Sequence, residues 1–158
     1  MAATEPKKLR CRLRLHTQRL ALLAVLLPGC AGAAGADDAR GRLNSVATAL
    51  AAGNASDAMA AFDKSYSKYE LLSNYFGGLS SAFQITNEID VIDEQDAPTE
   101  IKLTVHWGIT LQDSQTNFTE NRAADIEVLL LKERGKWRIA NLNPIDIFNP
   151  HPDAFRKR

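Results

Sequence analysis

The strongest pattern in this chain is a strict alternation of apolar and polar residues in its second half. Between positions 101 and 111 the apolar residues are Ile101, Leu103, Val105, Trp107, Ile109 and Leu111. The residues between them are polar or small: Lys102, Thr104, His106, Gly108 and Thr110. Because successive side chains of a strand point to opposite faces, the pattern predicts a long strand with one buried and one solvent-facing side.

Shorter runs of the same kind predict three more strands, at about residues 84–92, 122–133 and 137–142. The polar residues 93–98 predict a turn before the long strand, and residues 113–117 predict a hairpin loop after it. Leu129 and Leu131 lie on the opposite side from Ile126 and Val128, which indicates burial on both faces there. Pro144 ends regular pairing because it has no backbone donor.

The first half of the chain has helical spacing instead. Leu43, Val46, Ala47 and Leu50 recur at i, i+3, i+4 and i+7, which indicates one apolar helix face. We expect Asp37 or Asp38 to cap this helix and Gly53 to end it.

Two more helices are expected before the first strand. Ser56 or Asp57 is expected to open a short one, and Ser67 with Glu70 matches a capping box ahead of a third. The third helix would carry Leu71, Leu72, Tyr75, Phe76 and Leu79. Glycines 77 and 78 predict a bend near its end. Three helices followed by four strands indicate an α+β fold, with the N-terminal helices packed on one face of a curved antiparallel sheet.

Residues 1–36 have the order of a secretory signal peptide: a basic opening, a short apolar run and then small residues. A basic leader without structure, or a short helix on a membrane surface, is the alternative. Residues 27–30 resemble a bacterial lipobox ending at Cys30, and Cys30 would then be lipidated. Pro28 departs from the lipobox pattern. The alternative is cleavage after Ala33 or Ala36 without lipidation. We therefore expect export to the periplasm or to the cell envelope, with any membrane attachment through a lipid on Cys30.

The folded domain is expected over residues 37–150, followed by a loose tail at 151–158. Both cysteines, Cys11 and Cys30, lie in the leader, so the domain depends on its hydrophobic core rather than on disulfides. From Asp37 onward there are 13 Lys or Arg against 18 Asp or Glu, a net charge of −5. This balance argues against nucleic acid as a partner. We expect no metal site, because His106 has no second histidine within a regular element, and we expect no cofactor.

The order of these elements resembles the nuclear transport factor 2-like superfamily, whose cystatin-like cone is a curved sheet wrapped around helices. Three segments carry the resemblance: the alanine-rich residues 50–62 with their small turn and Phe62, the long alternating strand, and residues 135–139 with Trp137. It covers about residues 38–148. It implies a cone with an apolar interior, and in the enzymes of the superfamily, such as ketosteroid isomerases and polyketide cyclases, a catalytic acid on a short hairpin after the second helix.

This chain departs from those enzymes, because residues 63–66 run directly into the third helix. It is more similar to exported bacterial members without a known chemistry. Proton-transfer chemistry would need a carboxylate base and an oxyanion donor, for which Asp63, Asp90 and Tyr66 are the weak candidates. The alternative is that Asp63 ends a helix and the tyrosines pack on the sheet.

We therefore expect a binding role rather than catalysis, either for a small apolar ligand or for an envelope protein. The expected pocket lining is Leu72, Tyr75, Phe76, Val105, Trp107 and Trp137. These side chains would line a cavity or simply fill the core. Two further alternatives are an isomerase or cyclase-like enzyme, and a homodimer that pairs through the polar outer face carrying Thr104 and His106.

Overall fold

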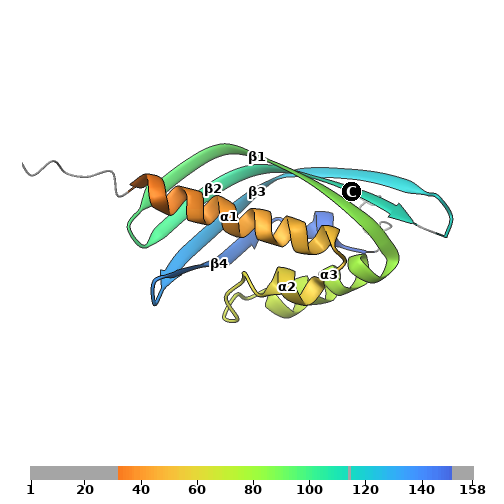
Figure 1. The fold of residues 1–158 in the computed structure, drawn as a ribbon, viewed down its shortest axis with the longest axis horizontal. Coiled ribbons are helices and arrows are strands. Elements are labelled where there is room, and N and C mark those ends of the chain that lie inside the picture. The colour runs from red at the N-terminus through yellow and green to blue at the C-terminus, as the bar shows by residue number, and fades with distance from the viewer. Residues whose placement is uncertain (1–31, 114, 151–158) are drawn as a thin grey trace, which may run out of the picture.

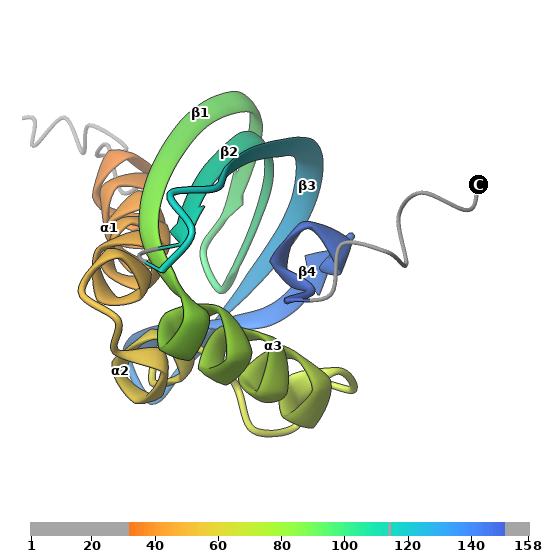
Figure 2. The ribbon, with the colours of Figure 1, turned by 90° about the vertical axis from the view of Figure 1, so that its right-hand side faces the viewer.

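The computed structural model describes residues 32–113 and 115–150, and the predicted leader up to position 31, with Cys30, and the tail at 151–158 lie outside them. The elements are α1 (Gly32–Ala51), α2 (Ala55–Met59), α3 (Tyr69–Ala82), β1 (Phe83–Ala97), β2 (Glu100–Asp113), β3 (Thr119–Glu133), β4 (Lys136–Asn143) and the 3-10 turn η1 (Asp146–Phe148). The strands form one antiparallel sheet in sequence order, and it curves around the helices (Figure 1, Figure 2). The predicted α+β fold is confirmed.

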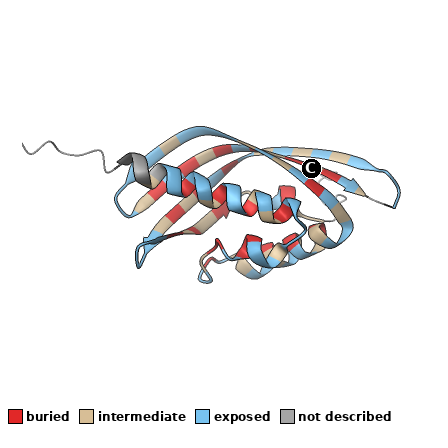
Figure 3. Ribbon diagram, in the orientation of Figure 1, coloured by how far each residue is buried: buried red, intermediate tan, exposed pale blue. Residues whose placement is uncertain are grey.

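The alternation along β2 sets the two faces of the sheet. Every apolar residue of that strand from Ile101 to Leu111 is buried, and the residues between them are exposed or partly exposed. The buried positions lie side by side across the strands and under α1 (Figure 3). We call the face that carries Trp107 the inner face and the face that carries His106 the outer face. The inner face and the helices enclose a single hydrophobic core.

β1 is longer than the sequence pattern indicates. Residues 93–97, predicted as a turn, continue the strand and pair with β2 through a register shift between Val91 and Asp93. Ile92 is the extra residue at this shift, and it is 58 % exposed. Such a bulge lets the strand bend while it keeps its pairing on both sides. The turn is confined to Pro98 and Thr99.

The β3–β4 hairpin has a two-residue loop, Arg134 and Gly135, with φ values of 47° and 81°. Positive φ at both positions is typical of the tight turns that match the twist of paired strands, and glycine adopts it without strain. This places Trp137 on the inner face at the start of β4, where it is 4 % exposed.

The helix starts differ from the sequence prediction. α1 begins at Gly32, so Asp37 and Asp38 lie inside the helix rather than at its cap. The side chain of Asn54 caps α2 by accepting the N–H of Asp57 at 3.1 Å. α3 begins after Lys68 and has no side-chain cap, so the capping box with Ser67 does not form. Gly53 ends the first helical region with φ of 71°, as expected.

The described helices are amphipathic or short. None of them, within residues 32–113 and 115–150, is long and apolar enough to cross a membrane.

Candidate functional site

Aromatic side chains surround Trp107 on the inner face. Phe148 of η1 meets the Trp107 ring edge-on, with the ring centroids 5.2 Å apart. It meets Phe76 of α3 in the same way, also at 5.2 Å, and Phe76 in turn contacts Phe62 at 6.0 Å. All four rings are at most 1 % exposed. Rings of the chain itself therefore occupy the space around Trp107.

Five of the six residues predicted to line a pocket lie on α3 or β2. Phe76 and Trp107 contact the same ring, that of Phe148. Leu72 and Val105 are fully buried, and Tyr75 is half-buried against the same core. The structure places these residues in the core, and ligand binding by them stays a prediction.

Trp137, the sixth of these residues, lies near the other end of the sheet. It pairs with Lys132 of β3, whose Nζ is 5.4 Å from the centroid of the tryptophan ring. Leu131, the neighbour of Lys132, pairs with Glu100 at the start of β2. Trp107 is seven residues further along β2, or roughly 23 Å at strand spacing. Trp137 is therefore not part of the aromatic group around Trp107.

Asp63 and Tyr66, two of the catalytic candidates, are each held in local structure. The Asp63 carboxylate accepts the backbone N–H of Ser65 at 2.7 Å, and this bond holds the pKa of Asp63 below its usual value. The Tyr66 hydroxyl donates to the Leu142 carbonyl at 2.6 Å, while burial raises the pKa of Tyr66. A general base works best with a pKa near the working pH, and the pKa of Asp63 is moved away from that range.

Asp90, the third candidate, is exposed on the outer face of β1 and lies opposite His106 in the strand register. The buried Tyr66 belongs to the core on the inner side of the sheet. The structure therefore does not bring Asp90 and Tyr66 to one cavity.

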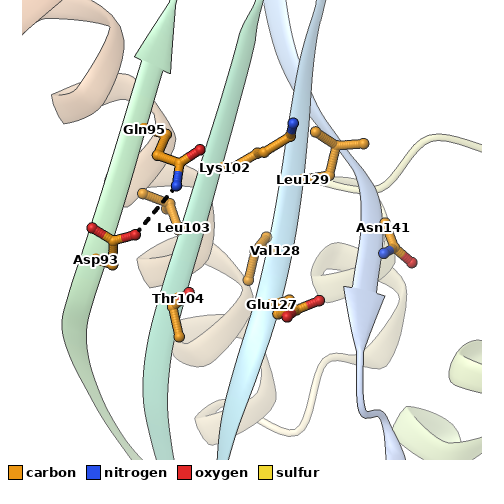
Figure 4. Close-up of a pocket in the computed structure, with 9 residues that line it drawn as sticks. All are labelled: Asp93, Gln95, Lys102, Leu103, Thr104, Glu127, Val128, Leu129 and Asn141. Carbon is orange, nitrogen blue, oxygen red and sulfur yellow. Dashed lines mark hydrogen bonds between the residues drawn. The ribbon is translucent and has the colours of Figure 1, made fainter.

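A hollow of about 310 Å³ lies on the outer face where all four strands run side by side (Figure 4). Its lining residues are Asp93, Gln95, Lys102, Leu103, Thr104, Glu127, Val128, Leu129 and Asn141. Figure 4 shows the labelled polar side chains above the sheet, with the helices behind it. Lys102 thus shares the hollow with two carboxylates, those of Asp93 and Glu127. The hollow is open and mixed in charge.

A second outer-face hollow, of about 430 Å³, lies further along the same strands. Gly108 and Ala123 pair across β2 and β3, and space is left there because glycine has no side chain and that of alanine is a single methyl group. Thr110 donates to Asn121 at 2.8 Å beside them. The residues that line this hollow are Thr86, Asn87, Glu88, His106, Gly108, Ile109, Thr110, Asn121, Arg122 and Ala123.

His106 borders the second hollow and pairs with Asp125. Its Nδ1 lies 2.7 Å from the Asp125 Oδ1, and the two side chains are 51 % and 65 % exposed. A side-chain pair this exposed contributes little to stability. Within residues 32–113 and 115–150, no three His, Cys, Asp or Glu side chains gather closely enough to hold a metal ion.

Arg122 was not singled out from the sequence, although it is the most buried charged side chain among the described ion pairs, at 8 % exposure. Its Nε and Nη2 donate to the two carboxylate oxygens of Glu120, each at 3.0 Å. Its Nη1 donates to the carbonyl oxygens of Ile147 and Asn149. Arg122 is four residues before Ile126 in the same strand, so the alternation of side chains places both on the inner face. This alternation could have identified Arg122 from the sequence as a charged residue on the buried face.

Comparisons with known proteins find structural similarity at low sequence identity. No protein-family model matches the chain, and no curated protein matches it. Among solved structures, it is similar to a conserved protein from Planctomyces limnophilus, with a TM-score of 0.63 and 10 % identity, over 69 % of this chain and 93 % of that one.

Two further solved structures have names that describe the fold. A ketosteroid isomerase-like protein from Erwinia carotovora has a TM-score of 0.57 and 12 % identity, over 67 % of this chain and 91 % of that one. A nuclear transport factor 2-like superfamily protein from Salmonella enterica has a TM-score of 0.56 and 10 % identity, over 67 % and 86 %. The resemblance predicted from the sequence is confirmed at the level of the fold: this chain folds as the nuclear transport factor 2-like proteins do.

Proposed function

We propose that this protein is a non-catalytic binding domain that uses the outer face of its sheet to hold a protein partner, and that a second copy of the chain is that partner. The observation that carries the proposal is the contrast between the two faces. The inner face is filled by its own core, whereas the outer face of β1–β4 bears two open hollows.

The composition of the outer face suits a second copy. A two-fold interface places the same patch on both sides, so the patch must be complementary to itself. The hollow in Figure 4 meets this condition, because Lys102, whose ammonium pairs with Glu100 at 3.0 Å, lines the same patch as the carboxylates of Asp93 and Glu127. The partly exposed Leu129 lies among them and supplies apolar area.

Light scattering after size-exclusion chromatography, over a range of protein concentrations, tests this assembly. We expect the wild-type chain to be a dimer and Thr104→Arg to be a monomer, because the new guanidinium would stand in the hollow of Figure 4. Asn74→Arg is the matched control: it adds the same charge at an exposed position on α3, and it is expected to leave the dimer intact. A wild-type chain that stays monomeric at every concentration contradicts the proposal.

Enzymatic proton transfer is the alternative function. The ketosteroid isomerase-like name of one structural neighbour favours it. The side chains favour it less, since Asp63 and Tyr66 are hydrogen-bonded within the fold and Asp90 lies on the outer face. Isomerisation of a ketosteroid by the wild-type chain, lost in Asp63→Asn, would support catalysis.

Export is proposed from the sequence of the leader. The basic, apolar and small-residue order of residues 1–36 supports it, and Cys30 within a lipobox-like segment supports a lipid anchor. Mass spectrometry of the mature N-terminus distinguishes a lipidated Cys30 from cleavage after Ala33 or Ala36.

A further inference from the structure

We propose that residues 145–150 form a displaceable plug, and that the Phe148 ring occupies an apolar site able to hold a small planar aromatic molecule in its place. This site is on the inner face. It is separate from the proposed outer-face dimer. The dimer is tested by light scattering, whereas the plug is tested by indole binding and hydrogen exchange.

The first step of the argument is the environment of Phe148. The ring is fully buried and lies edge-on to both Trp107 and Phe76. Aromatic rings prefer this edge-to-face arrangement. The polar atom of Trp107 is already satisfied, because its Nε1 donates to Asn87 Oδ1 at 3.1 Å. The walls that meet the Phe148 ring are therefore aromatic faces and edges, which would accept another flat aromatic molecule equally well.

The second step is the way in which the plug is attached. η1 is a single 3-10 turn of three residues, with its backbone bonds formed locally: Phe148 N–H to the Ile145 carbonyl and Asn149 N–H to the Asp146 carbonyl. Short 3-10 segments have weaker hydrogen-bond geometry than helices or strands. Segments that open locally are drawn from such weakly bonded parts of a fold. The plug is thus a short, locally hydrogen-bonded segment of the kind that can open without unfolding the sheet.

The third step is the latch that holds the plug closed. The guanidinium of Arg122 reaches from β3 to the carbonyl oxygens of Ile147 and Asn149, on either side of Phe148. Glu120 fixes this guanidinium through both of its carboxylate oxygens at 3.0 Å. One planar group therefore bridges the sheet to two points on the plug, and a point charge such as an ammonium does not reproduce that fork.

The fourth step concerns the other side of the plug. A Cβ added to Gly78 of α3 would lie 2.8 Å from Cγ of Pro150, well inside contact distance. The glycine therefore makes room for the end of the plug on the helix surface. α3 also contacts the 3-10 turn, and β3, which carries the latch, contacts that turn as well.

Indole is the probe for the site, titrated into the full chain with the heat of binding and two-dimensional NMR as readouts. Phe148→Ala removes the ring and leaves an apolar space of the kind that binds small aromatic molecules. We expect it to bind indole at least about tenfold tighter than wild type, because the site is free in every molecule and binding no longer requires the plug to open. Leu43→Ala, a buried truncation on α1, is the control for a new cavity elsewhere in the core, and any indole that it binds is expected to shift NMR signals of α1 rather than those of Trp107 and Phe76.

Arg122→Lys tests the latch in a chain that keeps Phe148. The variant keeps the positive charge beside Glu120 but loses the planar guanidinium, which bonds Glu120 and the two plug carbonyl oxygens at once. We expect faster hydrogen exchange at the Phe148 and Asn149 amides, unchanged exchange along β2, and indole binding about threefold to tenfold tighter than wild type, because a larger fraction of molecules is open. This variant decides the question if Phe148→Ala does not fold.

Three results would overturn the proposal. The first is a folded Phe148→Ala chain that binds indole no better than wild type. The second is Arg122→Lys without faster exchange at Phe148 and Asn149, or with faster exchange but no gain in affinity. The third is indole-induced NMR shifts at His106 and Thr104 rather than at Trp107 and Phe76, which would place binding on the outer face.

Discussion

Asn87 connects α1 to the centre of the sheet through one side chain. Its Nδ2 donates to the Ala47 carbonyl at 3.0 Å, and its Oδ1 accepts the indole N–H of Trp107 at 3.1 Å. We predict that Asn87→Ala lowers the free energy of unfolding by about 1–3 kcal/mol, because it leaves the buried Trp107 N–H without a partner. Urea denaturation measures the loss. Asn121→Ala, on the exposed Thr110 pair, is the control and should cost less than about 1 kcal/mol.

Asp113 makes stability depend on pH at the other end of β2. Its Oδ1 accepts the N–H groups of Gln115 at 2.7 Å and Thr116 at 3.2 Å, and these bonds lower the pKa of Asp113 below the usual 3.8. The unfolded chain therefore binds this proton more readily than the folded one, so the stabilisation is present above pH 3.8 and is lost as the pH falls through the lower folded-state pKa.

Thermal unfolding followed by circular dichroism from neutral to acidic pH checks this prediction. Relative to wild type, Asp113→Asn should unfold at a lower temperature at neutral pH and lose less stability in acid. The same substitution at Asp38, an exposed residue of α1, controls for the loss of one negative charge. Parallel pH profiles for wild type and Asp113→Asn would contradict the prediction.

At the scale of elements, the two adjacent glycines of α3 give a matched pair. Nothing lies within 4 Å of a Cβ built on Gly77, whereas one built on Gly78 lies 2.8 Å from Pro150. Alanine is favoured over glycine inside a helix by about 1 kcal/mol. We predict that Gly77→Ala raises the free energy of unfolding by up to about 1 kcal/mol and that Gly78→Ala lowers it, since Pro150 must move. Equal stabilisation of both variants would show that the contact with Pro150 is not maintained.

The elements that were predicted correctly are those with a local signal. The alternation from Ile101 to Leu111 and the spacing of Leu43, Val46 and Leu50 report burial directly. The predicted end of β1 was wrong because residues 93–96 are polar and show no apolar alternation. Pairing with β2 keeps residues 93–97 in the strand, and Glu94 also forms an ion pair with Arg40 of α1 at 2.6 Å. Such partners are distant in sequence, so no local pattern reveals them.

The candidate site also depends on contacts between residues that are distant in sequence. Phe76 and Trp107 were selected as apolar residues of predicted elements, and the structure places them against one ring. That ring belongs to Phe148, which follows the last strand in a segment without periodicity. Its position depends on the path of the chain after Pro144 and on the bonds from Arg122. Only the assembled fold shows that the chain fills its own cone.

At the scale of the whole molecule, the structure bears on where the folded chain begins. The backbone of Gly35 on α1 packs close to Trp137, Ile101 and Asp96, which lie 3.5–3.6 Å from a Cβ built on it. Trp137 and Ile101 are 4 % and 0 % exposed. A chain that starts at Asp37 lacks this turn of helix and leaves both apolar side chains partly open to water.

We therefore predict that a chain of residues 31–158 is more stable than one of residues 37–158 by about 1–3 kcal/mol, the cost of partly exposing two large side chains. Urea denaturation of the two chains measures the difference, and Arg40→Ala in the longer chain, which removes only the exposed pair with Glu94, should cost at most about 1 kcal/mol. Equal stability of the two chains would show that the first turn of α1 adds nothing. If the difference holds, cleavage ahead of Cys30 or after Ala33 keeps Gly35 on α1 and cleavage after Ala36 does not, so we expect the mature N-terminus to lie before Gly35.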